Sequence, residues 1–91
     1  MPYKNSNALP NFVIVRKSVN EIFIKEFGEK VREIRLQKNI SMQTLAYMIN
    51  VEYSQISRIE QGKINTSINM VYEISIALQI KPSELFNFDI K

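Results

Sequence analysis

Residues 53–61 combine an apolar stripe with polar side chains that can hydrogen-bond to the edges of DNA bases. At about 100° per residue, Ile56 and Ile59 fall on one side of a helix over this stretch. The other side carries residue types that pair with bases: arginine with guanine, glutamine with adenine, and serine with either. We therefore expect base contacts from Tyr53, Ser54, Ser57 and Arg58, with Gln55 at the edge of the contact.

The residues around this stretch have the layout of a helix-turn-helix, in which one helix props a second in the DNA major groove. Ser41 is a good N-cap for a helix over 42–49. Asn50 and Val51 then form a tight turn before the helix over 53–61. An ordinary solvated helix face is the alternative explanation for the polar residues. However, that face carries one positive and no negative charge, and a short capped helix precedes it, which favours DNA contact.

The order of several short motifs resembles the phage-repressor and Cro family, which is the XRE family of bacterial regulators. The Ile-Ser-x-Ile-Glu-x-Gly motif of the family stands unaltered at 56–62. Its opening pattern appears at 27–35, and its closing Pro-x-x-Leu-Phe at 82–86. The resemblance covers about residues 24–86. It implies an all-α, lambda-repressor-like domain of five helices that binds double-stranded DNA.

The resemblance also implies roles for residues other than those expected to contact bases. In the family, an arginine of the first helix and a glutamate of the recognition helix form an ion pair, and Arg35 and Glu60 stand at these two places. Phosphate contacts, which position a protein without reading sequence, are expected from three flanking polar residues. These are Gln43, Lys63 and Asn65.

Five positions depart from the family pattern, and one of them is Met42, which stands where a glutamine usually opens the second helix. Asn39, Asn50 and Gln79 stand where turn glycines are usual. Asparagine tolerates a positive φ, and glutamine does so less well. Glu52 stands where an N-cap serine usually precedes the recognition helix. Its charge suits a helix N-terminus but could repel nearby phosphates.

Residues 1–17 are expected to form a partly flexible N-terminal arm, and residues 18–91 the helix-turn-helix domain. The β-prone run 12–15 could be a short strand that packs on its own domain or pairs with its copy in a dimer. The residues at 18–21 have the form of a capping box, which predicts a helix over 19–38.

Helical spacing predicts which residues of the remaining helices face the core. The first helix is expected to bury Phe23, Phe27, Val31 and Ile34. A fourth helix, capped by Thr66 or Ser67, is expected to bury Ile68, Val71, Ser75 and Leu78. Pro82 suits the first position of a fifth short helix over 82–86.

Composition argues against catalytic and metal chemistry. The chain has no cysteine and no histidine, so it lacks thiolate metal ligands, disulfides and the commonest general base. Its single aspartate is Asp89, and its two glycines are too far apart for a phosphate-binding loop. We expect no catalytic residues, no metal and no cofactor, and therefore no enzyme.

The positive charge lies with the helix-turn-helix half. The net charge is +3 and the sequence pI is near 9.3. Residues 1–63 have a balance of +4 and residues 64–91 a balance of −1. No apolar run approaches the roughly 18 residues that span a bilayer, and no signal-peptide core is present. We expect a cytoplasmic protein with no membrane partner and no small-molecule ligand.

A homodimer on a palindromic operator is expected, because one module offers few base contacts and a small core gains from a partner. By family resemblance the interface is expected at the fifth-helix end, with Ile80, Phe86 and Phe88. The plausible settings are phage repression, control of a restriction–modification operon, or an antitoxin. The alternative function is a protein-interaction module, antitoxin-like or a co-regulator, with weak or no DNA binding.

Overall fold

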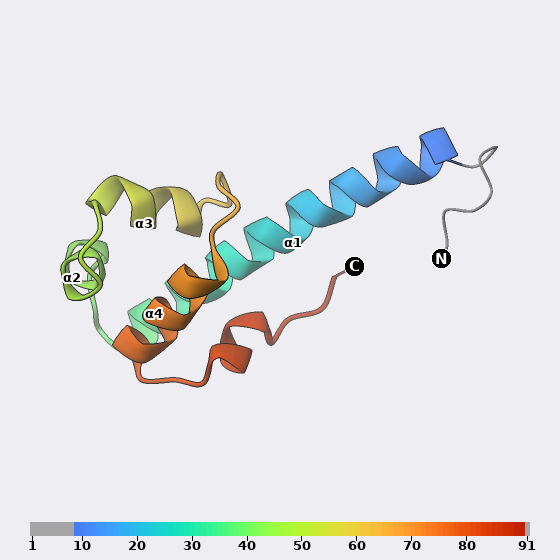
Figure 1. The fold of residues 1–91 in the computed structure, drawn as a ribbon. Helices are drawn as coiled ribbons and strands as arrows, with labels where there is room; N and C mark the ends of the chain where they lie inside the picture. The colour runs from blue at the N-terminus through green and yellow to red at the C-terminus, as the bar shows by residue number, and fades with distance from the viewer. Residues whose placement is uncertain (1–8, 91) are drawn as a thin grey trace.

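The computed structural model describes the backbone of residues 9–90 and the side chains of residues 18–90. Within these residues every regular element is helical, which confirms the all-α class. The elements are α1 (Leu9–Gln37), α2 (Met42–Met48), α3 (Tyr53–Glu60), α4 (Ile68–Leu78) and the 3₁₀ segment η2 (Pro82–Phe86). Figure 1 shows α1 as a long rod with the other elements gathered beside its C-terminal part.

The prediction for the start of the first helix was wrong. α1 begins at Leu9, so the run 12–15 is helical rather than a strand, and the capping-box pattern at 18–21 lies inside the helix. A four-residue strand needs a neighbouring edge, whereas extending a helix adds a hydrogen bond per residue without new nucleation. Pro10 falls in the first turn, where its missing N–H costs no helical bond. Residues 1–8 of the predicted arm lie outside the described residues.

The fifth element is a 3₁₀ segment, not the expected α-helix. It spans five residues, and its turn is closed by a bond from the Glu84 amide to the Lys81 carbonyl at 3.0 Å. The Glu84 carboxylate in turn accepts from the Lys81 amide at 3.0 Å. So short a segment can complete few of the longer i to i+4 bonds. Leu85 is fully buried and holds η2 on the domain.

The core lies where the C-terminal part of α1 meets the other elements. It buries Phe27, Val31, Ile34, Leu45, Ala46, Ile56, Ile59, Ile74, Ala77, Leu78 and Leu85. Full burial of a Leu, Ile or Phe side chain contributes about 1.5–3 kcal/mol. The helical spacing of the sequence thus identified most of the inward side chains.

Two side chains predicted to be inward are exposed. Ile68 is 88% exposed at the start of α4, and Phe23 is 41% exposed on α1. Ser67 caps α4 by accepting from the Met70 amide at 3.0 Å, as the sequence predicted. Helical spacing sets the direction of a side chain but not whether another element lies in front of it. At the first turn of α4 no element of the described chain covers Ile68.

The turns use left-handed backbone at the positions where the family places glycine. Asn39, Asn50 and Gln79 each have φ of 59°. At Gln79 this conformation ends α4 and lets the Ile80 amide donate to the Ser75 carbonyl at 3.0 Å. The turn therefore folds Ile80 back toward the domain.

Candidate nucleic-acid interface

The connection from α2 to α3 is locked by local hydrogen bonds. Ser41 caps α2 by accepting from the Thr44 amide at 3.0 Å. After α2, the left-handed Asn50 lets the Val51 amide donate to the Ala46 carbonyl at 3.0 Å. Short turns of this kind fix the angle between two helices, so α2 holds α3 in a defined orientation.

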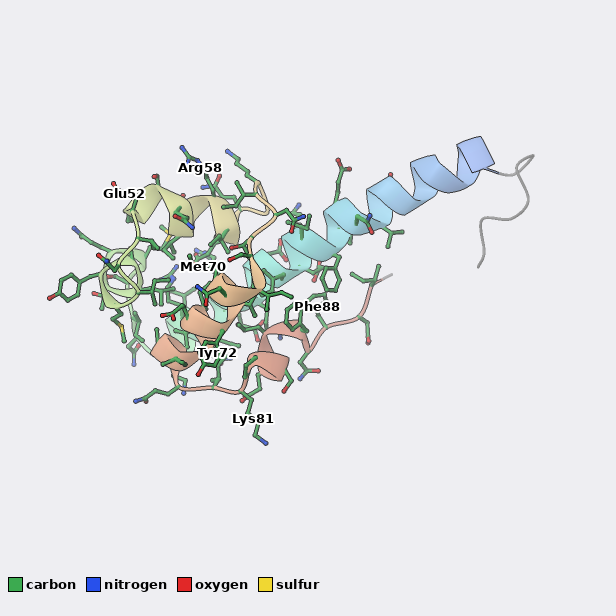
Figure 2. All side chains as sticks on the ribbon, in the orientation of Figure 1. Glu52, Arg58, Met70, Tyr72, Lys81 and Phe88 are labelled. Carbon is green, nitrogen blue, oxygen red and sulfur yellow. The ribbon has the colours of Figure 1, made fainter. Side chains whose placement is uncertain are left out.

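α3 has one buried and one exposed face. Ile56 and Ile59 are 0% and 1% exposed, while Ser54 and Arg58 are exposed and Tyr53 is 51% exposed. Figure 2 shows Arg58 on the outer side of α3, pointing away from the rest of the domain. The exposed face is thus free to enter a groove of DNA without disturbing the core.

Two of the residues expected to contact bases are partly buried, namely Gln55 and Ser57. Ser57 Oγ accepts a hydrogen bond from Gln61 Nε2 at 2.7 Å, which leaves its own hydroxyl proton available as a donor. Gln61 itself is exposed and was not among the expected contacts, although its spacing of four residues from Ser57 was a usable signal.

Gly28 allows α1 to approach α3 closely. A methyl group at this position would overlap the carbonyl oxygen of Ile59 and would lie 2.9 Å from that of Glu60. The backbones of the two helices are therefore in direct contact, and any larger residue would push α3 away from α1. No local sequence pattern predicted this role for Gly28.

The structure brings Arg35 and Glu60 together across the α1–α3 contact. Arg35 Nε donates to Glu60 Oε2 at 2.6 Å and Nη2 donates to Oε1 at 2.9 Å, which is a bidentate pair. Nη1 donates to the Ile40 carbonyl at 2.8 Å. The two side chains are only 6% and 4% exposed. Arg35 therefore ties α1 to the loop before α2 and to α3.

The hydrogen bond and the charge of Glu60 raise the pKa of Arg35, against the opposing effect of burial. The guanidinium is a group whose folded pKa lies above its unfolded value. Its contribution to stability is therefore present throughout the neutral range and is lost only as the pH rises into the strongly alkaline range.

The residues expected to contact phosphates lie on either side of α3. Gln43 is exposed in the first turn of α2, and Lys63 and Asn65 are exposed in the connection from α3 to α4. A fourth residue, the basic Lys25, joins them through the fold. The Lys25 backbone on α1 touches Gly62, where an added Cβ would lie 2.7 Å from Lys25 Cα, and the Lys25 side chain is exposed. No local sequence signal pairs two residues this far apart.

The three residues expected at a dimer interface do not form one exposed surface. Ile80 and Phe88 pack against the core as partly buried residues. Only Phe86 keeps substantial exposure, at 40%, and its ring stacks on Phe27 and Phe23 with centroid distances of 5.2 and 5.9 Å. The turn at Gln79 explains the inward position of Ile80. On α4, the exposed apolar residues are instead Ile68, Tyr72 and Ile76.

No helix within 9–90 is long and apolar enough to cross a membrane. No group of three or more acidic, cysteine or histidine side chains in that range could hold a metal ion. Among the described residues, the outer face of α3 is the main candidate for a functional site.

A family model described as Helix-turn-helix matches residues 31–85, which is more than half of the chain. The chain belongs to this helix-turn-helix family. It is an XRE-type family of transcriptional regulators and not of enzymes. The matched range contains α2, α3, α4 and the Arg35–Glu60 pair.

Two helix-turn-helix relatives are control proteins. Control protein C.BamHI of Bacillus amyloliquefaciens is 43% identical over 63 residues, which are 68% of this chain and 78% of that protein. Control protein C.MunI of Mycoplasma sp is 37% identical over 70 residues, which are 76% and 93% of the two chains. The crystal structure of the restriction-modification controller protein C.AhdI from Aeromonas hydrophila has a TM-score of 0.68 at 35% identity, and the match covers 69% of this chain and 96% of that one.

Replacing Lys63 with alanine is expected to weaken DNA binding evenly across sequences. A lysine–phosphate contact adds about 0.9 to the slope of log affinity against log salt concentration, and the variant should lose about that amount. The measurement is a binding titration at several salt concentrations. Lys81→Ala is the matched control, because Lys81 lies on the opposite side of the domain from Arg58 (Figure 2). Equal slopes for the two variants would remove Lys63 from the interface.

Replacing Glu52 with serine is expected to raise both stability and DNA affinity. Glu52 is exposed at the N-cap of α3 and makes no side-chain capping bond. A serine N-cap stabilises the helix, while the loss of the glutamate charge removes a favourable interaction with the helix dipole. The net gain in the free energy of unfolding should be about 0.5 kcal/mol. Glu52→Gln separates the two effects in urea unfolding and binding titrations, since it removes the charge without supplying a good cap. If both variants bind DNA like the parent protein, Glu52 lies far from the phosphates.

Proposed function

We propose that this protein regulates transcription as a dimer that binds a palindromic operator in double-stranded DNA, with α3 in the major groove. The observation that carries the proposal is that α3 has a polar outer face and a buried apolar inner face. Arg58, Ser54 and Tyr53 are exposed there while Ile56 and Ile59 are buried. An exposed arginine on a helix held rigidly from behind is suited to bidentate contact with guanine.

The support behind α3 adds to this proposal. Base recognition is stronger when the helix that reads the bases is already held in place, because ordering it on binding costs free energy. The Arg35–Glu60 pair and the close contact at Gly28 fix α3 on α1. Exposed Lys25 and Lys63 lie beside the end of α3, where phosphates would flank the groove.

The relatives support a more specific setting. Two similar proteins are named as control proteins, and a structural neighbour is a restriction-modification controller protein. We propose the same setting here, namely control of a restriction–modification operon. For the dimer contact we propose the surface around Phe86, the one residue of the expected interface that keeps substantial exposure.

Selection from a random pool of duplex DNA tests the proposed function. The expected result is a two-fold symmetric site whose half-sites lie about one helical turn or a multiple of it apart, because each α3 reads one half-site. Sedimentation of the protein on the selected duplex should give two chains per site. Enrichment of no sequence, with the protein folded, would favour the protein-interaction module instead.

A further inference from the structure

The apolar stripe that α1 buries in the core continues beyond the core. Phe27 and Val31 are buried, and four-residue steps toward the N-terminus lead to Phe23 and Val19. These two side chains are 41% and 39% exposed, and the neighbouring Ile22 is 39% exposed. The apolar residues therefore change from buried to exposed along α1, and each four-residue step turns them about 40° around the helix, away from the core.

The N-terminal half of α1 projects past the other elements (Figure 1). The molecule measures 49 × 22 × 20 Å, and the 29 residues of α1 account for its length. In the sequence the apolar spacing continues at Val15 and Phe12. A helix with an apolar stripe normally packs that stripe against another element. Among the residues whose side chains are described, no element covers Val19, the next position of the stripe before Phe23.

An apolar cavity adjoins the exposed stripe. Its volume is about 170 Å³, and it lies between α1, the residues before α4, and η2. Phe23, Phe27, Ile64 and Phe86 line it, and the 88%-exposed Ile68 stands at its edge. The cavity thus extends the apolar surface from α1 to Phe86, which the proposed function places in the dimer contact.

We infer that the N-terminal half of α1 packs antiparallel against the same segment of a second copy, about a two-fold axis near Val19. Charge complementarity selects this arrangement. Residues 9–17 contain Arg16 and Lys17 and no carboxylate, whereas residues 20–29 contain three glutamates and one lysine. Antiparallel pairing sets the basic segment of each copy beside the acidic segment of the other, and a two-fold axis applies this match twice. Parallel pairing would set like charges together.

This pairing covers the exposed apolar surface. With the axis at Val19, residue 15 of one copy lies opposite Phe23 of the other, and residue 11 lies opposite Phe27. The first turns of the second helix therefore lie level with Phe23 and Phe27, two of the residues that line the cavity. In this arrangement each copy covers the exposed apolar stripe of the other.

The pairing also sets the distance between the two recognition helices. The same α1 that carries Val19 holds α3 through Gly28 and Arg35. Joining two such helices makes a rigid connection from one α3 to the other. This step rests on the proposed function, because it defines the spacing of the half-sites that a dimer can read.

Single cysteines test the arrangement directly, because the natural chain has none. Val19→Cys is expected to form an intermolecular disulfide under mild oxidation. Ile22→Cys is not, because antiparallel pairing displaces the two copies of residue 22 by about 9 Å along the helices, beyond disulfide reach. Asn20→Cys, on another face, is the control. Crosslinking of both the Val19→Cys and the Ile22→Cys variants would indicate parallel pairing, and crosslinking of neither would also overturn the inference.

A charge placed at the axis gives an independent test in solution. Val19→Glu should raise the dimer dissociation constant by about tenfold or more, because two carboxylates would meet in an apolar contact. Asn20→Glu adds the same charge beside the stripe and should have little effect on sedimentation. A dimer that tolerates Val19→Glu but is disrupted by Tyr72→Glu would place the contact on α4 and overturn the inference.

DNA binding separates this inference from the proposed function. Val19→Glu should lose at least about tenfold affinity for a two-half-site duplex and keep its affinity for a single half-site. If no duplex binds the unchanged protein, the proposed function fails while the crosslinking result stands. If the duplex binds Val19→Glu and the unchanged protein equally well, the pairing of α1 fails while the proposed function stands.

Discussion

Replacing Glu60 with glutamine is expected to lower the free energy of unfolding by about 3–5 kcal/mol, because it leaves the buried guanidinium of Arg35 without its counter-charge. Glutamine offers one oxygen where Glu60 accepts two bonds, at 2.6 and 2.9 Å. Its amide nitrogen would face a second donor from Arg35. The Arg35 side chain is 6% exposed, so water cannot replace the lost acceptor.

Urea unfolding monitored by circular dichroism measures this loss. Glu29→Gln is the matched control, because Glu29 is an exposed glutamate on α1 and its change should stay within about 0.5 kcal/mol. The conservative exchange Arg35→Lys should also be destabilising, since lysine cannot make the bidentate pair and the third bond to Ile40 together. Equal stabilities for Glu60→Gln and Glu29→Gln would mean that the pair is solvated in solution.

Replacing Arg58 with alanine is expected to abolish discrimination at one base pair of each half-site while leaving stability unchanged. A bidentate arginine–guanine contact contributes about 1–3 kcal/mol of discrimination, which is roughly 5- to 150-fold in affinity. Arg58 is exposed and points away from the core, so its removal disturbs no packing.

Repeating the DNA selection with the variant protein shows whether Arg58 reads a base. The selected site should lose its preference at one symmetric pair of positions and keep the others. Arg58→Lys distinguishes base reading from phosphate contact, because lysine keeps the charge but lacks the planar fork. A site whose preferences are the same for all three proteins would show that Arg58 makes no base contact.

Much of the helix-turn-helix was predictable because its determinants are local. The caps at Ser41 and Ser67 and the left-handed Asn50 depend on neighbours within four residues. The buried Ile56 and Ile59 follow from helical spacing within one short segment. The observed bounds of α2 and α3 accordingly lie within one residue of the predicted ones. The exposed face of α3, where base contacts are expected, follows from the same spacing.

The errors arise where the outcome depends on what lies opposite a residue. The run 12–15 has β-prone residues, yet a strand requires an edge to pair with and helical continuation does not. Ile68 has the right spacing for burial but no element of the described chain in front of it. Ile80 and Phe88 are partly buried against the core, and their place in a dimer contact stays a prediction.

The sequence by itself determined the helix-turn-helix, its caps and the polar face of α3, because hydrogen bonds and spacing within a few residues specify them. Only the tertiary structure decided that Gly28 lets α1 touch the end of α3, and that Lys25 lies beside Gly62. It also decided how far α1 projects and which of its apolar residues stay exposed. These features depend on the distance between backbones that are far apart in the chain, and helical spacing carries no information about that distance.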